Sequence, residues 1–182
     1  MPSKKNPAIS KDPTASRPNM PGYGLPKSKK GMLAWQWAAK QLTRSRQYWI
    51  ITVRPDARPH AMPVWGLWLD GMFYFSTGSK TRKAKNLASN PHCIVATEDA
   101  AQAVIMEGTA TPVRDVSVIR KFLPLYGKKY KWDMSSMKDD LSSFNEPVFA
   151  VDPAVVFGQI EKTFSKTATR WTFPHTRGKN RA

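Results

Sequence analysis

The stretch STGSKTRKAKN, from Ser76 to Asn86, contains four hydroxyls, a glycine and four cations, but no acid. Cations are unfavourable where a helix begins, because that end of the helix dipole is partly positive. A bound anion would relieve the conflict, since free N–H groups and cations would point at it. Ser76 and Thr77 can donate hydroxyl hydrogen bonds, and Arg82 with Lys83 suits a phosphate. A solvated basic helix end is the alternative.

Other chemistries find little support. The histidines His60, His92 and His175 show no metal-ligand spacing, and Cys93 is the only cysteine, so we predict no metal site. A single cysteine also fits a reducing cytoplasm, where we place the protein. The sequence contains no Walker loop, no dinucleotide glycine motif and no serine-nucleophile motif. We therefore assign no catalytic side chain, and redox chemistry would have to come from a cofactor.

The formal net charge of +16 is concentrated at the two ends of the chain. Residues 1–31 contain six prolines and seven cations, so we predict a disordered basic leader. Residues 174–182 are predicted to be a basic tail, and 32–173 a single folded domain. The tails leave open a non-enzymatic polyanion-binding module, although nucleic acid is an improbable partner. No apolar run is long enough to span a membrane.

The elements that must position the basic stretch are mostly strands. β-branched and aromatic runs predict strands at 48–53, 60–69, 72–77, 93–97, 101–113, 148–151, 155–160 and 167–173. Pro63 and Gly66 are expected to break the second of these in its middle. Helical spacing predicts helices at 32–44, 80–89 and 115–126. The turn Asp70-Gly71 joins strands two and three of an antiparallel meander, and Gly108 predicts a bulge or bend. Short helices among antiparallel strands favour a closed or split β-barrel over a parallel sheet.

The segment YWIITVRPDARPHAMPVWGLWLDGMFYFSTGSKTRKAKNLASNP resembles the flavin-binding split-barrel superfamily, which includes pyridoxamine 5'-phosphate oxidase-like proteins and flavin/deazaflavin oxidoreductases. The shared pattern is PH-x-x-PVW, a DG hairpin, then RKA-x-NL-x-x-NP. The resemblance implies a six-stranded antiparallel split β-barrel, mainly β, that forms a homodimer. It also implies a cofactor groove at the subunit interface.

Matching motifs assign cofactor-binding residues. The backbone beneath the cofactor ring would come from Met62, Pro63, Val64 and Trp65. The phosphate would be held by Ser76, Thr77, Arg82 and Lys83. The motif TRWTF, 169–173, resembles the end of the deazaflavin-using branch, where Arg170 and Trp171 would reach the cofactor or close the barrel.

Two departures argue against pyridoxamine phosphate oxidation. Ala103 stands where those oxidases carry a flavin-contacting glutamine, and their carboxy-terminal substrate motif is absent. The resemblance then implies an oxidoreductase that uses coenzyme F420, or FMN as the alternative, and transfers a hydride to an unidentified small organic acceptor. A flavin carrier is a further alternative. The cluster LYGKKYKW, 125–132, could meet the carboxylates of the coenzyme F420 tail, and His60 is either a packed residue or a proton donor.

Overall fold

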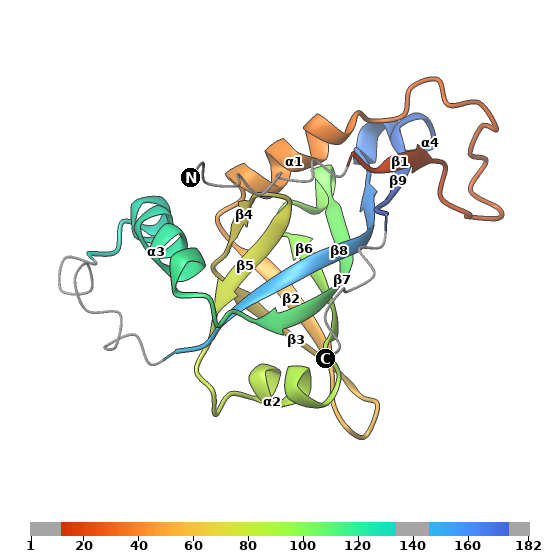
Figure 1. Ribbon diagram of the computed structural model, residues 1–182. Helices are drawn as coiled ribbons and strands as arrows, with labels where there is room; N and C mark the ends of the chain where they lie inside the picture. Colours follow the sequence, from red (N-terminus) through yellow and green to blue (C-terminus); the bar gives the residue numbers. More distant parts are fainter. Residues whose placement is uncertain (1–11, 134–145, 175–182) are drawn as a thin grey trace, which may run out of the picture.

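The computed structural model describes residues 12–133 and 146–174, and it is mainly antiparallel β-sheet with short helices (Figure 1). The strands are β1 (Thr14–Ser16), β2 (Tyr48–Val53), β3 (Pro59–Val64), β4 (Leu67–Leu69), β5 (Met72–Ser76), β6 (His92–Thr97), β7 (Val104–Pro112), β8 (Val148–Gly158) and β9 (Thr169–Thr172). The helices are α1 (Trp35–Arg44), α2 (Arg82–Ser89), α3 (Val116–Tyr130) and α4 (Phe164–Thr167).

The barrel closes through one strand that is broken in two. β2 pairs with β3 and β6, β6 with β7, β7 with β8, β8 with β5, and β5 with β4. Only Trp65 and Gly66 separate β3 from β4, so these two segments act as halves of a single strand and complete a ring of six. The predicted six-stranded split β-barrel is confirmed, whereas the homodimer stays a prediction.

Close packing explains two glycines in this barrel. A Cβ atom on Gly66 would lie 2.2 Å from Cζ of Phe73, so only glycine allows the strand to break there. A Cβ atom on Gly108 would lie 2.5 Å from the Asp152 carbonyl oxygen. The β7–β8 register shifts between Glu107 and Gly108, which confirms the bulge predicted at this glycine.

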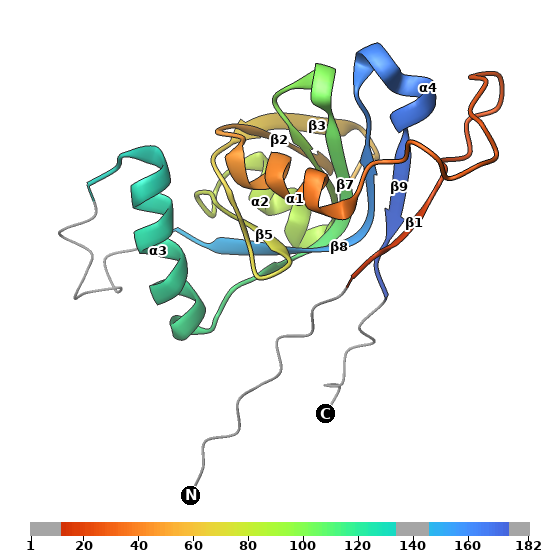
Figure 2. The ribbon, with the colours of Figure 1, turned by 90° about the horizontal axis from the view of Figure 1, so that it is seen from above.

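Two helices close the ends of the barrel. α1 lies across one end and α2 across the other, as the two perpendicular views show (Figures 1 and 2). α1 buries Ala38 and Leu42, and α2 buries Ala84 and Leu87, all in the core that fills the barrel. Removing such side chains from water contributes roughly 25 cal/mol per Å² of apolar surface. The core therefore fixes where α2, with its basic first turn, sits relative to the strands.

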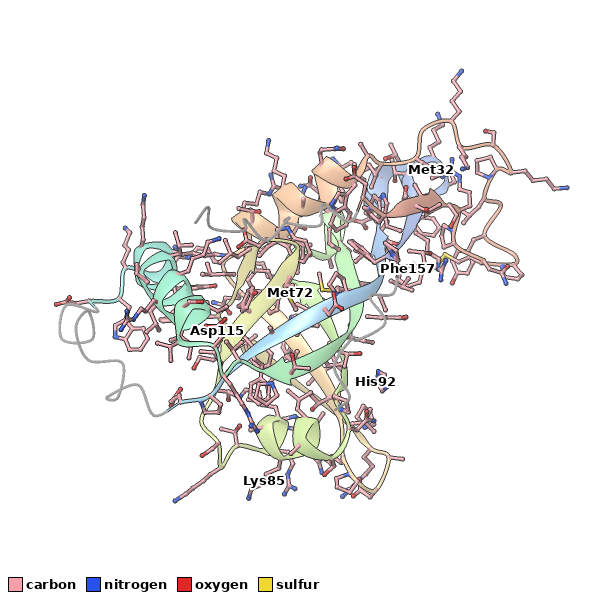
Figure 3. All side chains as sticks on the ribbon, in the orientation of Figure 1. Met32, Met72, Lys85, His92, Asp115 and Phe157 are labelled. Carbon is pink, nitrogen blue, oxygen red and sulfur yellow. The ribbon has the colours of Figure 1, made fainter. Side chains whose placement is uncertain are left out.

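The third helix, α3, packs on the outside of the barrel. Its aromatic residues Phe122, Tyr126 and Tyr130 form a second apolar cluster with Leu67 and Tyr74 of β4 and β5. The side chain of Asp115 caps the helix by accepting from Ser117 N at 2.8 Å, as the sequence predicted (Figure 3). The helix continues to Tyr130, four residues beyond the predicted end, because the packing of Tyr126 and Tyr130 in this cluster stabilises the last turn.

The sequence-based strand pattern was wrong at two places, whereas the segment 60–69 is broken in the middle, as Pro63 and Gly66 predicted. Its two halves pair antiparallel with β2 and β5. β8 runs unbroken through Asp152 and Pro153, because the proline lies at the bulge, where a ladder hydrogen bond is already interrupted. β7 begins at Val104, after a 3-10 turn, η1 (Ala100–Gln102), that is capped by Asp99.

Part of the predicted leader is ordered. Thr14–Ser16 form β1, which pairs antiparallel with β9, so the expectation of disorder is wrong for this segment. Proline-rich composition disfavours an independent core, but a short strand can add to the edge of an existing sheet. Helix α1 begins at Trp35, three residues after its predicted start, and Leu33 N just before it donates to Thr169 Oγ1 at 2.8 Å. Residues 1–11 and 175–182 lie outside the described chain, and the division into leader, domain and tail stays a prediction.

Candidate functional site

A cavity of about 330 Å³ brings together residues from four elements. It lies between α2, α3 and the strand break that follows β3. Five of the residues predicted from sequence line it: Pro63, Val64, Trp65, Ser76 and Lys83. Gln47 and Tyr126 complete the lining. The residues that the motifs assign to a ring and to a phosphate therefore share one cavity.

The start of α2 is built around threonine hydroxyls. Thr81 caps the helix by accepting from Ala84 N, and its hydroxyl lies 3.2 Å from the hydroxyl of Thr77. Thr77 is buried and joined to this turn, so it shapes the turn and does not line the cavity. No acid lies in the first turn of α2, so the conflict between its dipole and its cations persists in the folded chain.

Lys83 is a partly buried cation at the wall of the cavity. Desolvation lowers the pKa of its ammonium group, and Glu146 opposes this shift. Glu146 also approaches Ser76, with Oε2 3.4 Å from the serine hydroxyl oxygen. Burial makes the charge on Lys83 costly, so an anionic ligand would be attracted strongly here.

The remaining predicted residues lie around the cavity without lining it. Met62 is 43% exposed on β3, and Arg82 is exposed at the first position of α2. Lys85 lies on the side of α2 that faces away from the barrel (Figure 3). Trp171 is buried in the core, which favours barrel closure over cofactor contact. Arg170 donates to the hydroxyl of Thr172 at 2.7 Å.

A second cavity of about 460 Å³ adjoins the first and shares Trp65 and Tyr126 with it. Its other lining residues are Tyr130, Lys131, Trp132 and Glu146. The sequence marked 125–132 only as a basic cluster. The sequence feature that could have predicted this lining is the four-residue spacing of Tyr126 and Tyr130, which places both rings on one side of a helix. The two cavities together offer a cationic end and an aromatic end.

The strand break is held by α3. The Tyr130 hydroxyl accepts from Gly66 N at 2.7 Å and lies 2.9 Å from the Gly66 carbonyl oxygen. Lys129 Nζ donates to the same carbonyl at 3.0 Å and to the Tyr48 hydroxyl at 2.7 Å. Desolvation lowers the pKa of Lys129 to about 8. These bonds fix the backbone next to Trp65, which forms the wall common to both cavities.

Metal and membrane signals are both missing from the part of the chain that the structure describes. Across 12–133 and 146–174, no group of three His, Cys, Asp or Glu side chains is placed to bind a metal ion. None of the helices in these ranges is both long and apolar enough to cross a membrane.

Comparison with known proteins identifies a family. A family model described as pyridoxamine 5'-phosphate oxidase matches residues 36–159. No curated protein sequence matches the chain. The matched residues include the whole cavity lining of Pro63, Val64, Trp65, Ser76 and Lys83.

Solved structures share the fold at low sequence identity. A conserved hypothetical protein from Mycobacterium tuberculosis is 20% identical, with a TM-score of 0.61, over 82% of this chain and 94% of its own. A FAD-binding protein from Mesorhizobium loti is 16% identical, with a TM-score of 0.55, over 77% and 96%. A protein described as an F420 reductase is 20% identical, with a TM-score of 0.53, over 64% and 93%.

Proposed function

This chain belongs to the pyridoxamine 5'-phosphate oxidase family, and from that premise we propose that it is an oxidoreductase that binds a phosphate-bearing flavin or deazaflavin in the two adjoining cavities. Coenzyme F420 is the favoured cofactor, on the resemblance of the PVWG, RKA and TRW motifs, and FMN is the alternative. The observation that carries the proposal is the gathering of Ser76, Lys83 and the Pro63–Trp65 backbone around one space.

The residues present fit such a cofactor. A flavin or deazaflavin has a flat ring at one end and a phosphate on a flexible chain. The cavities have a matching polarity, with Ser76 and Lys83 at one end and Trp65, Tyr126 and Trp132 at the other. The desolvated ammonium of Lys83 gains the most from a phosphate partner, because its charge is already partly withdrawn from water.

The protein's contribution to the reaction is position and exclusion of water. A bound flavin or deazaflavin supplies hydride transfer. Lys83 and Ser76 would anchor its phosphate, and the backbone at Pro63–Trp65 would orient its ring. Tyr126 and Tyr130 form an apolar wall that keeps water from an acceptor held beside the ring. The acceptor is a small organic molecule, and its proton can come from solvent.

The predicted homodimer has a suitable surface. Trp49, Ala96 and Ile105 lie in one register row across β2, β6 and β7, and Trp49 is 46% exposed. Ile51 and Ile94 form the next row and line a cavity of about 430 Å³ on the same sheet. A second copy covering this face would bury these apolar side chains. Light scattering should give a dimer mass, and Trp49→Glu should shift it towards the monomer.

Parallel titration with coenzyme F420 and FMN tests the cofactor. Tryptophan fluorescence of the full chain should be quenched, because Trp65 and Trp132 line the cavities. We expect micromolar or tighter affinity for at least one cofactor, and tighter binding of coenzyme F420. Tighter binding of FMN would select the alternative. No binding of either cofactor at low salt, where electrostatic attraction is greatest, would refute the proposal.

A further inference from the structure

One face of β3 continues from the cavity towards the β2–β3 hairpin. His60, Met62 and Val64 alternate along β3, so their side chains share a face. Val64 lines the cavity and Met62 is 43% exposed, so this face is open beyond the cavity. Among the described strands, β3 pairs with β2 alone, which leaves its other edge free. A ligand in the cavity could therefore extend along β3 as far as His60.

Helix α2 is fastened opposite this face by a buried hydrogen bond. Asn86 Nδ2 donates to Thr52 Oγ1 at 2.9 Å, and both residues are fully buried. Thr52 of β2 is the register partner of His60. Lys83 precedes Asn86 by three residues, so the two lie on the same side of α2. Lys83 on α2 and His60 on β3 therefore lie on opposite sides of the region between α2 and the β2–β3 hairpin.

Two buried nitrogens at this place have no hydrogen-bond partner in the described chain. They are Nε of Arg54 and Nδ1 of His60, and the buried acceptor Oδ1 of Asn86 on α2 is likewise without a partner in the described chain. Arg54 follows Thr52 by two residues, at the end of β2, so it approaches this region on the same face of the hairpin as His60. Buried polar nitrogens normally have acceptors. Two nitrogens without acceptors on one face of the hairpin indicate a ligand that supplies acceptor oxygens.

The charged groups that act on His60 are all cations. Its pKa lies below the ordinary value of 6.5, first because of desolvation, then because of Arg54 from β2 and Lys83 and Arg82 from α2. The acid in the turn of the same hairpin, Asp56, is paired with Arg58 at 2.6 Å. Glu146 acts on Lys83, so the positive charge at this place is only partly compensated in the free protein.

We infer that Arg54 and His60 complete an anion site with Lys83 and Arg82, and that His60 takes up a proton when a dianion such as a phosphate monoester binds there. The inference deepens the proposed function, because the phosphate monoester of FMN would be that dianion, whereas the phosphodiester of coenzyme F420 would bring the same oxygens with a single charge. A bound dianion offsets the repulsion between the cations and offers oxygens to the unpaired nitrogens. The same change favours the imidazolium form of His60.

Linkage fixes the sign of the pH dependence. Binding takes up a proton at pH values between the pKa of His60 in the free protein and the higher pKa of His60 in the complex. Affinity for the dianion is therefore greater at low pH, and each unit of pKa rise corresponds to a tenfold gain in affinity. Above the higher value, His60 is neutral in both states and contributes no proton-linked affinity.

Sulfate is the probe that tests the site directly, because it remains a dianion from pH 5 to 8 and does not titrate itself. The imidazole NMR signals of the full chain are followed against pH in sodium sulfate and in sodium chloride of equal ionic strength. His60→Asn and His92→Asn assign the signals. We expect His60 to titrate below 6.5 in chloride and at least half a unit higher in sulfate. The signals of the exposed His92 are the control for effects of sulfate away from this site.

Equal titration of His60 in the two salts would overturn the inference, and so would an equal sulfate effect on His92. Arg54→Met is a second variant that leaves His60 in place, and it should reduce the sulfate-induced rise by half or more. A full rise in Arg54→Met would remove Arg54 from the site.

Cofactor binding separates this inference from the proposed function. Calorimetry with FMN near pH 6, in two buffers of different ionisation enthalpy, should show more proton uptake, or less proton release, in wild type than in His60→Asn. Riboflavin, which lacks the phosphate, should show no such difference. A sulfate effect on His60 without binding of either cofactor would leave the anion site standing and refute the proposed function. Cofactor binding with equal proton uptake in wild type and His60→Asn would refute the role of His60 alone.

Discussion

The indole of Trp65 stacks on the ring of Tyr130, with ring centroids 4.4 Å apart and planes inclined by 5°. The Tyr130 hydroxyl also holds both backbone polar groups of Gly66, the next residue. One side chain of α3 thus fixes the ring that both cavities share and the break between β3 and β4. Both cavities lie beside this break, so helix packing and site geometry depend on the same residue.

Tyr130→Phe should destabilise the fold while keeping the stacked ring. The buried Gly66 N–H would lose its acceptor, and an unsatisfied buried group costs about 1–3 kcal/mol. Urea unfolding followed by circular dichroism measures the loss. Tyr23→Phe is the matched control, because Tyr23 is 62% exposed and should change stability by less than about 0.5 kcal/mol. Equal effects of the two substitutions would mean that the hydroxyl does not hold the break.

Lys83→Ala should weaken cofactor binding at least tenfold. The variant loses a charge-assisted contact with the phosphate, which is worth roughly 1.5–3 kcal/mol, and 1.4 kcal/mol is tenfold in affinity. Lys85→Ala is the control on the same helix, because Lys85 faces away from the barrel (Figure 3). Fluorescence titration with FMN and coenzyme F420 measures both. A comparable loss in Lys85→Ala would instead indicate a tail contact or a diffuse electrostatic effect.

Lys129 should make stability rise with pH relative to a variant without it. Desolvation lowers its pKa from 10.5 to about 8 in the folded protein, so between these values the unfolded chain binds more protons. Folded wild type therefore gains stability over Lys129→Met between pH 7 and 9.5. The gain is on the order of 1 kcal/mol once solvent screening of this half-buried group is allowed for.

Urea unfolding at the two pH values measures this difference. Burial raises the pKa of the Cys93 thiol to about 12, so Cys93 lowers the stability of the folded protein as the pH rises. Because this effect is the same in wild type and Lys129→Met, comparing the two proteins removes it. Lys128→Met is the control, because Lys128 is exposed next to Lys129. A pH-independent difference between wild type and Lys129→Met would show that Lys129 is solvated.

Local signals in the sequence predicted local structure well. Asp70-Gly71 predicted the β4–β5 hairpin, and Asp115 marked the start of a predicted helix, because turns and caps depend on a few adjacent residues. Gly66 also predicted a break in the strand at 60–69, but no local signal explained that break. Its cause is the space available beside Phe73 and the hydroxyl of Tyr130, which are set by tertiary packing.

The candidate site was predictable where its residues belong to one motif. Pro63–Trp65, Ser76 and Lys83 lie within 21 successive residues, and the structure places them around one cavity. Gln47 and Tyr126 come from distant segments, and no spacing rule links them to the motif. The role of the hairpin at Arg54 and His60 also depends on how α2 docks on β2, which the buried bond between Asn86 and Thr52 determines.

Arg17→Ala should release the segment that joins β1 to α1. The guanidinium of Arg17 donates to four backbone carbonyls, those of Ser28, Lys30, Lys166 and Ala168, at 2.8–3.1 Å. These bonds hold the loop and the edge strand against α4 and β9. Loss of these charged donors at a partly exposed place should lower the free energy of local opening of the segment by roughly 1–3 kcal/mol.

Limited trypsin digestion reads out this opening, because Lys27, Lys29 and Lys30 lie in the loop. We expect cleavage there to be at least tenfold faster in Arg17→Ala than in wild type, since 1.4 kcal/mol of local opening free energy is tenfold in the open population. Arg44→Ala, at an exposed position on α1, should cleave like wild type. Equally rapid cleavage of wild type and Arg17→Ala would show that Arg17 does not hold the segment, and that the predicted disorder extends to α1. A selective effect of Arg17 would mean that a single guanidinium joins a proline-rich segment to the barrel.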